Sequence, residues 1–300
     1  MRLIHLAITS LFLFACQEQI QEQGTPQPPV NNNPDQDNSG TPVSGKYANC
    51  LNVLDNTTFD IVTWNIEQFS TTNTNLTLLA EMIIAMDADV IGVQEINSRN
   101  AFDALLTSLP SYSGKLYLNG SLGQGYIYKN SEITNLTDLT LWFVGETSPF
   151  PRPLVVTTAT HTSGKQVMLV NVHLKCCDDG IARRREASTR LKSFIDTNFS
   201  TTPIVVLGDF NDEIDEPVSD NVFQNLIADS NNYAFADMSI ATGSNAYWSY
   251  PSYPSHIDHH LISNELFASK NAVKTIRFEF CDSRYSNEIS DHRPVLLQLK

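Results

Sequence analysis

Polar side chains of the kinds that bind metal ions and phosphate recur where apolar runs of this sequence end or begin. Each by itself is ordinary, because a polar residue beside an apolar run is usually a turn residue or a helix cap, and a lone histidine is usually a partly buried one. Six such places in one chain are hard to explain by core packing, and they indicate that strand ends bring these side chains to a common site. The residues are Asn65, Glu95, His173, Asp209 with Asn211, Asp258, and Asp291 with His292.

The apolar runs that position these residues are short and rich in β-branched side chains, which is typical of strands. Several are apolar on both faces, as expected when two sheets pack together beneath outer helices. Amphipathic spacing predicts helices at 76–84 and 187–195. The expected strands are 59–64, 89–93, 126–128, 154–159, 167–172, 204–207, 257–262 and 295–299.

Seven short stretches resemble the motifs of the endonuclease/exonuclease/phosphatase superfamily, the group typified by pancreatic-type deoxyribonuclease, over a span from about Phe59 to Leu299. The resemblance implies an α/β fold, a four-layer αββα sandwich of two mostly antiparallel sheets with helices outside. It also implies a metal-dependent phosphoric ester hydrolase with its site at one end of the sandwich. The stretches are TWNI at 63–66, VQEI at 93–96, PRPLV at 151–155, NVHLK at 171–175, GDFND at 208–212, HIDHHLIS at 256–263 and SDHRPV at 290–295.

By this resemblance Glu95 is a direct metal ligand, helped by Asp291 and, in some members, by Asn65. Carboxylate and amide oxygens together with water suit Mg²⁺, whereas sulfur and imidazole select zinc. We therefore expect Mg²⁺ as the cofactor, with Mn²⁺ as a substitute.

The remaining site residues divide into phosphate donors and groups that move protons. Asp209 resembles the residue that orients or deprotonates the attacking water. Asp258 and His292 resemble a pair in which the carboxylate fixes the tautomer and favours the imidazolium. Either Asp209 or His292 could be the base. The expected donors to phosphate oxygens are Asn65, Asn211, His173 and Arg152.

Departures from related families narrow the substrate. Asp212 stands where inositol-polyphosphate phosphatases usually place an arginine, and no tryptophan-rich segment typical of abasic-site endonucleases precedes Asp258. Arg152 and His173 look most like those of secreted nucleases, so a phosphodiesterase that acts on DNA or RNA is the leading hypothesis.

Other functions on the same fold are a phospholipid or sphingomyelin phosphodiesterase and a phosphomonoesterase. The aromatic segment 248–253 would be the membrane-facing loop of a lipid enzyme, or it simply packs as a loop. A non-catalytic surface-binding module would have lost Glu95, Asp209 or His292, and all three are present.

The first residues resemble a bacterial lipoprotein signal. Arg2 and an apolar run too short to span a bilayer lead into Leu13-Phe14-Ala15-Cys16, a lipobox whose cysteine is acylated; a plain signal peptide with an incidental cysteine is the alternative. We expect a signal peptide at 1–15, a disordered polar tether at 16–46, and the endonuclease/exonuclease/phosphatase domain at 47–300. The protein would be lipid-anchored in the cell envelope, facing the periplasm or the exterior, and no protein partner is implied.

Four further cysteines are available for disulfides in an oxidising compartment. Cys176 and Cys177 are adjacent, and a bridge between them would strain the peptide that joins them. We therefore expect them to pair with Cys50 and Cys281. A zinc site is the alternative, but an adjacent pair lacks the two-residue gap of most zinc-binding loops.

The net charge of −14 opposes non-specific attraction to polyanions, although carboxylates around a metal ion are neutralised when the ion binds. One dense positive patch lies on the second expected helix. It is either a solvated helix face or a phosphate-steering patch at the mouth of the site. Its residues are Arg183, Arg184, Arg185, Arg190 and Lys192.

Overall fold

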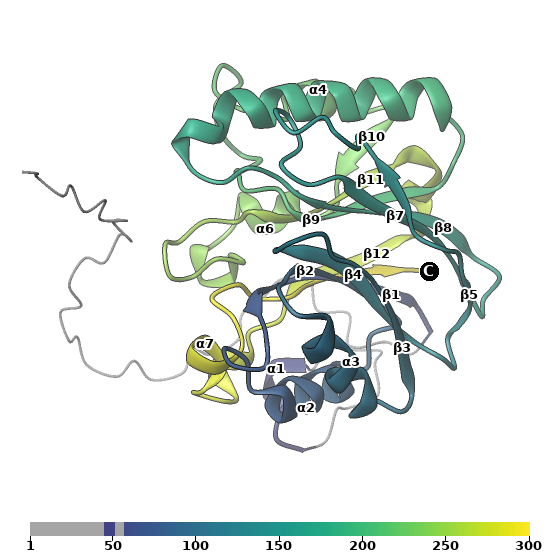
Figure 1. Ribbon diagram of the computed structural model, residues 1–300. Coiled ribbons are helices and arrows are strands. Elements are labelled where there is room, and N and C mark those ends of the chain that lie inside the picture. The colour runs from purple at the N-terminus through teal and green to yellow at the C-terminus, as the bar shows by residue number, and fades with distance from the viewer. Residues whose placement is uncertain (1–44, 52–56) are drawn as a thin grey trace, which may run out of the picture. The chain divides into compact units, whose positions relative to one another are not determined.

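Apolar strands under amphipathic helices build the folded part of the chain in the computed structural model, which describes residues 45–51 and 57–300 (Figure 1). The expected signal peptide, Cys16 and the tether up to residue 44 lie outside the described residues. None of the helices that the described residues form is long and apolar enough to cross a membrane.

The first sheet has the strand order β12-β13-β1-β2-β4-β3. β1 and β2 are parallel, and the other neighbours are antiparallel. The strands of this sheet are β1 (Phe59–Phe69), β2 (Val90–Ile96), β3 (Tyr112–Tyr117), β4 (Gly123–Lys129), β12 (Lys270–Thr275) and β13 (Val295–Leu299).

The second sheet has the order β10-β11-β9-β8-β7-β5, with β6 paired to β7. β8 and β9 are parallel, and the other neighbours are antiparallel. The strands of this sheet are β5 (Ile133–Leu136), β6 (Thr140–Trp142), β7 (Leu154–His161), β8 (Gln166–His173), β9 (Ile204–Asp209), β10 (Tyr233–Phe235) and β11 (Asp258–Ser263).

Long helices cover the outer faces of the two sheets. α2 (Leu76–Met86) and α3 (Arg99–Thr107) lie against the first sheet, and α4 (Ile181–Asn198) lies along the second (Figure 1). α4 buries Ala187, Leu191 and Ile195, which recur every four residues on one face. A third apolar core lies between the sheets. The four-layer αββα sandwich expected from the sequence is therefore confirmed.

Short helical turns connect the long elements. They are α1 (Ala48–Leu51), α5 (Gln224–Ile227), α6 (Met238–Ala241) and α7 (Tyr285–Glu288), with 3₁₀ turns η1 (Asp178–Gly180), η2 (Asn245–Tyr247), η3 (Asn264–Ser269) and η4 (Phe278–Phe280).

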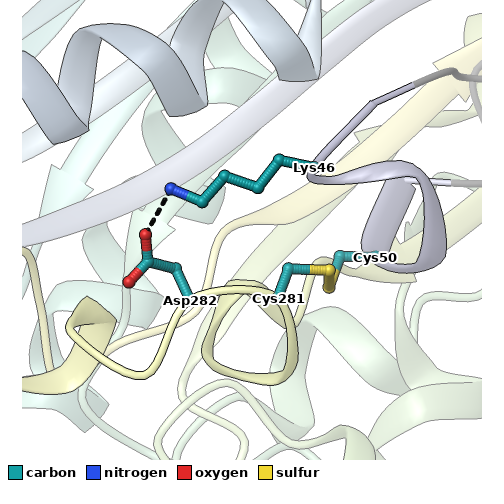
Figure 2. Close-up of a disulfide and its surroundings, with 4 residues drawn as sticks. All are labelled: Lys46, Cys50, Cys281 and Asp282. Carbon is teal, nitrogen blue, oxygen red and sulfur yellow. Dashed lines mark ion pairs between the residues drawn. A yellow bond between two sulfur atoms is a disulfide. The ribbon is translucent and has the colours of Figure 1, made fainter.

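The disulfide pairing expected from the sequence is wrong. Cys50 at the start of the fold is bonded to Cys281 (Figure 2). Cys176 and Cys177 are exposed free thiols, with their Sγ atoms 2.9 Å apart. Fold topology brings η4 beside α1, and Tyr47 packs edge-on against Phe278 there. That proximity of distant segments is not visible in cysteine spacing.

Lys46 strengthens the same junction. Its Nζ lies 2.5 Å from Oδ2 of Asp282, next to the disulfide (Figure 2). The hydrogen bonds of Asp282 with Arg284 and with Lys46 lower the pKa of its carboxyl despite partial desolvation. The beginning of the folded chain is therefore fixed to the loop that precedes the last strand.

Candidate active site

The expected site residues converge because neighbouring strands of each sheet end side by side. In the second sheet, the pairing of β8 and β11 with β9 puts His173 and Asp258 opposite Asp209. In the first sheet, the parallel pair β1–β2 aligns Asn65 with the residue before Glu95. Asn65 joins these groups at one end of the sandwich, because it donates to Glu95 within the first sheet and to Asp209 of the second sheet.

Asp209 is the buried centre of the site. Its Oδ2 accepts a hydrogen bond of 3.0 Å from Nδ2 of Asn65 and lies 3.6 Å from Nε2 of His173 and 4.0 Å from Nε2 of His292. Its Oδ1 accepts a hydrogen bond of 2.9 Å from the backbone N–H of Asn211. Burial raises the pKa of Asp209 to about 7, against the opposing attraction of His292. A carboxylate in this environment is suited to orient water and accept its proton.

His292 is surrounded by carboxylates. Its Nδ1 lies 2.8 Å from Oδ2 of Asp258, and its Nε2 lies 3.9 Å from Oδ1 of Asp291. Burial lowers the pKa of His292, but attraction to Asp258, Asp209 and Asp291 outweighs burial and raises it to about 10. The ring is therefore an imidazolium at neutral pH. Its Nδ1–H donates to Asp258, and its Nε2–H faces the same space as Asp209.

His173 is a second, neutral histidine beside Oδ2 of Asp209. Burial, followed by the positive charges of Arg152 and His292, holds the pKa of His173 well below its usual value. Its Nε2 lies 3.6 Å from both Oε1 of Glu95 and Oδ2 of Asp209, and no residue of the described chain bonds its buried Nδ1. A proton on Nε2 makes this ring a donor towards the carboxylates and any oxygen between them.

Three carboxylates lie at the edge of the site. Oε2 of Glu67 accepts a 3.1 Å hydrogen bond from the backbone N–H of Asp291, and Oε2 of Glu95 accepts one of 3.0 Å from the N–H of Gln68. Burial and repulsion from Asp291 raise the pKa of Glu67. Burial raises the pKa of Asp291, and Glu95 adds to this against the attraction of His292.

These mutually repelling carboxylates offer the oxygen ligands that a divalent cation prefers. Hard oxygen ligands that repel one another are stabilised by a bound Mg²⁺ or similar ion, and Glu95 and Asp291 are the ligands expected from the sequence. Glu67 is the member that sequence reasoning missed. The available signal was its position two residues after Asn65 in the same strand.

Asn65 is oriented as a hydrogen-bond donor. Its Nδ2 reaches Oε1 of Glu95 at 3.3 Å as well as Asp209, while its Oδ1 accepts the backbone N–H of Glu67 at 3.1 Å. Ser290 Oγ fixes the backbone by donating to the Asn65 carbonyl at 2.7 Å. The amide group therefore has both Nδ2 hydrogens and one lone pair of its oxygen engaged within the site.

Arg152 and Asn211 support the chain that follows β8. Nη1 of Arg152 donates to the His173 carbonyl at 2.7 Å, and Nδ2 of Asn211 donates to the Leu174 carbonyl at 3.2 Å. Burial lowers the pKa of Arg152, and attraction to Asp209 opposes that shift. Both side chains thus lie at the site as expected, each with one donor group already engaged by the backbone.

The backbone of the site adopts conformations that most residues avoid. Glu95 and Asn211 have φ values of 63° and 56°, and Gly208 has φ 146°. A Cβ at position 208 would lie 2.0 Å from the Val172 carbonyl oxygen, so only glycine allows β8 and β9 to approach this closely. Such conformations concentrate at sites where side chains must be aimed.

Arg184 does not steer phosphate. Its side chain is 4% exposed, and its Nε donates to Oδ2 of Asp212 at 2.7 Å. Its Nη1 donates to the carbonyls of Lys175 and Cys177. Arg184 therefore connects the loop after β8 to the loop after β9, and the phosphate-steering interpretation is wrong for this residue.

The other cations of the expected patch are also engaged within the fold. Arg183 and Arg185 donate to backbone carbonyls, and Arg190 and Lys192 form ion pairs with carboxylates. The structure thus supports the solvated helix face that the sequence left as the alternative.

A buried network that sequence reasoning missed supports the same loop. The Asp237 carboxylate accepts from Nε2 of His256 at 3.0 Å and from Nδ1 of His259 at 2.6 Å. His259 Nε2 donates to the Asp212 carbonyl at 3.0 Å, and His256 Nδ1 accepts from the Ser249 N–H at 3.2 Å. Because all four ring nitrogens are paired, these residues form a positioning network without a free coordination site.

The aromatic segment 248–253 reaches the site through one residue. The Tyr250 ring packs on His292 with centroids 4.8 Å apart. Nε1 of Trp248 donates to the Ile240 carbonyl, whereas Tyr253 is 77% exposed. The segment therefore combines loop packing with one projecting tyrosine.

Comparisons with known proteins agree with this geometry. The sequence model of the Endonuclease/Exonuclease/phosphatase family matches residues 62–292. No curated protein sequence matches the chain significantly.

Solved structures share the fold at low sequence identity. D. rerio TDP2 complexed with a single-strand DNA product is 14% identical, with a TM-score of 0.67 over 82% of this chain and 100% of that chain. The human Nocturnin catalytic domain with a bound sulfate anion is 17% identical, with a TM-score of 0.58 over 81% and 93%. A Bacteroides thetaiotaomicron mannosyl-6-phosphatase is 14% identical, with a TM-score of 0.59 over 81% and 99%.

The family match covers most of the chain and includes every strand end that carries a site residue. The chain belongs to the endonuclease/exonuclease/phosphatase family, and it is a phosphoester hydrolase that depends on a divalent metal ion.

Proposed function

We propose that this protein is a Mg²⁺-dependent phosphodiesterase that hydrolyses DNA or RNA. One observation carries the proposal: the carboxylate of Asp209 and the Asp258-bound imidazolium of His292 face each other at 4.0 Å, beside the donor groups of Asn65 and His173. An acceptor and a donor of protons on either side of one space are what hydrolysis of a phosphate ester requires.

Each of these residues has a separate role in the proposed hydrolysis. Asp209 orients the attacking water and takes its proton. His292, surrounded by three carboxylates, donates through Nε2 to a phosphate oxygen or to the leaving oxygen. Asn65 and neutral His173 donate to the charge that grows on the non-bridging oxygens. These donors are held by strand ends, and Asn65 would exchange one of its carboxylate partners for the phosphate oxygen.

Glu95, Asp291 and Glu67 would hold the Mg²⁺ ion, with Mn²⁺ as a substitute. When bound, the ion would supply positive charge to a non-bridging phosphate oxygen. Oxygen ligands without a thiolate favour Mg²⁺ among common divalent ions.

A nucleic acid substrate is supported by the D. rerio TDP2 structure that contains a single-strand DNA product. Exposed Tyr253 near Tyr250 offers an aromatic ring on which a base could stack. Because the cations of α4 are engaged within the fold, we expect binding to rest on the site and not on a long positive track. Phospholipid, sphingomyelin and phosphomonoester hydrolysis remain alternatives, and the mannosyl-6-phosphatase neighbour is the observation that favours the last.

A substrate panel tests the proposal. Purified protein is assayed on single- and double-stranded DNA, RNA, sphingomyelin, sugar phosphates and a chromogenic phosphodiester, with Mg²⁺, with Mn²⁺ and with chelator. We expect Mg²⁺-dependent cleavage of DNA or RNA that is lost in Asp209→Asn. Hydrolysis of a sugar phosphate or a lipid without nucleic acid cleavage would replace the nuclease assignment.

We also propose that the protein is exported and anchored by acylated Cys16. The support is the residue pattern of the first sixteen positions. Cys16→Ser should move the protein out of the membrane fraction and abolish labelling by a palmitate analogue. Unchanged labelling would reject the anchor.

A further inference from the structure

A histidine and two carboxylates meet at the end of β2 that is remote from the active site. Asp89 directly precedes β2 and Glu95 lies near its other end, six positions later, so extended backbone separates them by about 20 Å. His161 ends β7 of the second sheet, and Glu132 lies in the turn between β4 and β5. One side-chain oxygen or nitrogen of each of these three residues lies within 4.8 Å of the others.

The imidazole of His161 is aimed at the two carboxylates. Its Nε2 lies 3.5 Å from Oδ2 of Asp89 and 3.9 Å from Oε2 of Glu132. Within residues 57–300 this nitrogen forms no hydrogen bond, although the side chain is only 8% exposed. An imidazole nitrogen that faces two carboxylates at these distances can share a cation with them.

The orientation of the ring is fixed by its other contacts. Phe59 stacks on it with centroids 4.9 Å apart and an interplanar angle of 11°. Nδ1 lies 2.8 Å from Oγ of Ser163 and 3.2 Å from the Ser163 backbone nitrogen. The Ser163 N–H donates to Nδ1, so the neutral ring carries its proton on Nε2. A cation at Nε2 therefore requires the other tautomer, in which Nδ1–H donates to the Ser163 hydroxyl. Histidines that bind metal ions are commonly held through their second nitrogen in this way.

Backbone hydrogen bonds hold the three segments together. The Lys129 N–H donates to the Asp89 carbonyl at 2.9 Å, and the Thr162 N–H donates to the Glu132 carbonyl at 2.8 Å. Nζ of Lys129 pairs with Asp87 at 2.9 Å and stays 4.0 Å from Glu132. The oxygens that face His161 also accept hydrogen bonds, Oδ2 of Asp89 from the Asp60 N–H at 2.8 Å and Oε2 of Glu132 from the Thr162 hydroxyl at 3.1 Å. Each oxygen thus keeps one lone pair for a ligand, in a position that these bonds set beforehand.

The separations suit one ion in particular. Tetrahedral zinc with bonds of about 2.0–2.2 Å keeps its ligands about 3.3–3.6 Å apart, and imidazole favours zinc over magnesium. We propose that Asp89, Glu132 and His161 bind a structural Zn²⁺ ion that clamps the two sheets together at this end of the sandwich. The distance of 3.9 Å between Nε2 of His161 and Oε2 of Glu132 would shorten by a few tenths of an ångström when the ion binds. Glu132 is 32% exposed and leaves a side open for water as the fourth ligand.

This site is tested with purified full-length protein carrying Glu95→Gln, which weakens the catalytic cation site. After chelator treatment and dialysis, Zn²⁺ is titrated by calorimetry, and the thermal midpoint is followed with and without Zn²⁺. We expect one Zn²⁺ per chain and a rise of several degrees in the midpoint, because an ion that binds only the folded chain stabilises it.

Two further substitutions locate the ion. Glu132→Gln leaves the partly exposed turn intact and should weaken Zn²⁺ binding at least tenfold, while His161→Ala should abolish it. Exposed Glu265→Gln serves as the matched control and should bind Zn²⁺ as before. Failure of Zn²⁺ to raise the midpoint, or unchanged Zn²⁺ affinity in Glu132→Gln, would overturn the proposal even if His161→Ala fails to fold.

Discussion

His292 Nδ1 and Asp258 Oδ2 lie 2.8 Å apart in a buried ion pair. The pair keeps the imidazole charged and turns its Nε2 towards Asp209. His292→Ala should therefore lower kcat by about 10²-fold or more with little change in KM, since the donor acts mainly on the transition state. Asp258→Asn should cause a smaller loss, because the ring remains. Steady-state kinetics on the substrate found in the panel measures both.

The control for these variants is Asp103→Asn, which alters an exposed carboxylate on α3. It should keep full activity. Full activity in His292→Ala would contradict the role assigned to the ion pair.

The three carboxylates at the site edge predict a dependence on metal concentration. Glu95→Gln and Glu67→Gln each remove one negative charge from the expected Mg²⁺ site, so each should raise the Mg²⁺ concentration that gives half-maximal activity. Chelator should abolish hydrolysis, and added Mg²⁺ should restore it. Activity that survives chelation, or an unchanged Mg²⁺ requirement in Glu95→Gln, would argue against this placement.

From the contacts of Arg184 we expect its removal to destabilise the fold and to leave nucleic acid binding unchanged. Arg184→Ala removes the partner of the partly buried Asp212, so the loss in the free energy of unfolding should approach, without reaching, the cost of about 3–5 kcal/mol for breaking a fully buried pair. Urea denaturation measures the loss. Arg190→Ala, which removes an exposed ion pair, is the control and should leave unfolding nearly unchanged. A stable Arg184→Ala with weakened nucleic acid binding would restore the steering interpretation.

From the burial of His260 we expect the free energy of unfolding to decrease as the pH is lowered. Burial lowers its pKa to about 4, below the usual 6.5, and neither ring nitrogen has a partner in the described chain. Between these values the unfolded chain binds the extra proton, so the free energy of unfolding decreases as pH falls from 6.5 to 4, by about 3 kcal/mol. His260→Leu should flatten this part of the profile, measured by urea denaturation at several pH values. An equally steep profile in the variant would show that other groups cause it.

The disulfide predicts that Cys50 and Cys281 stabilise the fold and that Cys176 and Cys177 do not. Cys50→Ser with Cys281→Ser should lower the free energy of unfolding by about 2–5 kcal/mol. Cys176→Ser with Cys177→Ser, the matched control, should leave it unchanged, because these thiols are exposed and free. Thiol counting by mass spectrometry should find two reactive cysteines in the folded domain, and four would refute the pairing.

Much of the fold could be predicted, because buried strands appear in the sequence as short apolar runs rich in β-branched residues. The eight expected strands overlap β1, β2, β4, β7, β8, β9, β11 and β13. Strands at sheet ends, such as β3 and β12, were missed, since Lys115, Lys270 and Lys274 interrupt their apolar pattern. Edge strands have one unpaired side and tolerate such charges.

Most residues of the candidate site could also be predicted from the sequence, but Glu67, the Asp237 network and the burial of Arg184 could not. Residues at the ends of predicted strands could be expected to converge, and they do. Glu67 and the Asp237 network could not, because a carboxylate in a strand or a loop has no pattern of its own. Arg184 looked like a surface cation, since helix periodicity alone does not reveal that the loops after β8 and β9 cover it.

The bond between Cys50 and Cys281 joins positions 231 residues apart, so every strand from β1 to β12 lies inside one covalent loop. A protease that cuts a surface turn within this loop opens the ring without releasing a fragment. Nicked protein should therefore migrate as an intact chain on a gel without reductant and as two pieces with it. Integrity of the backbone and integrity of the assembled sandwich are thus separate properties of this molecule.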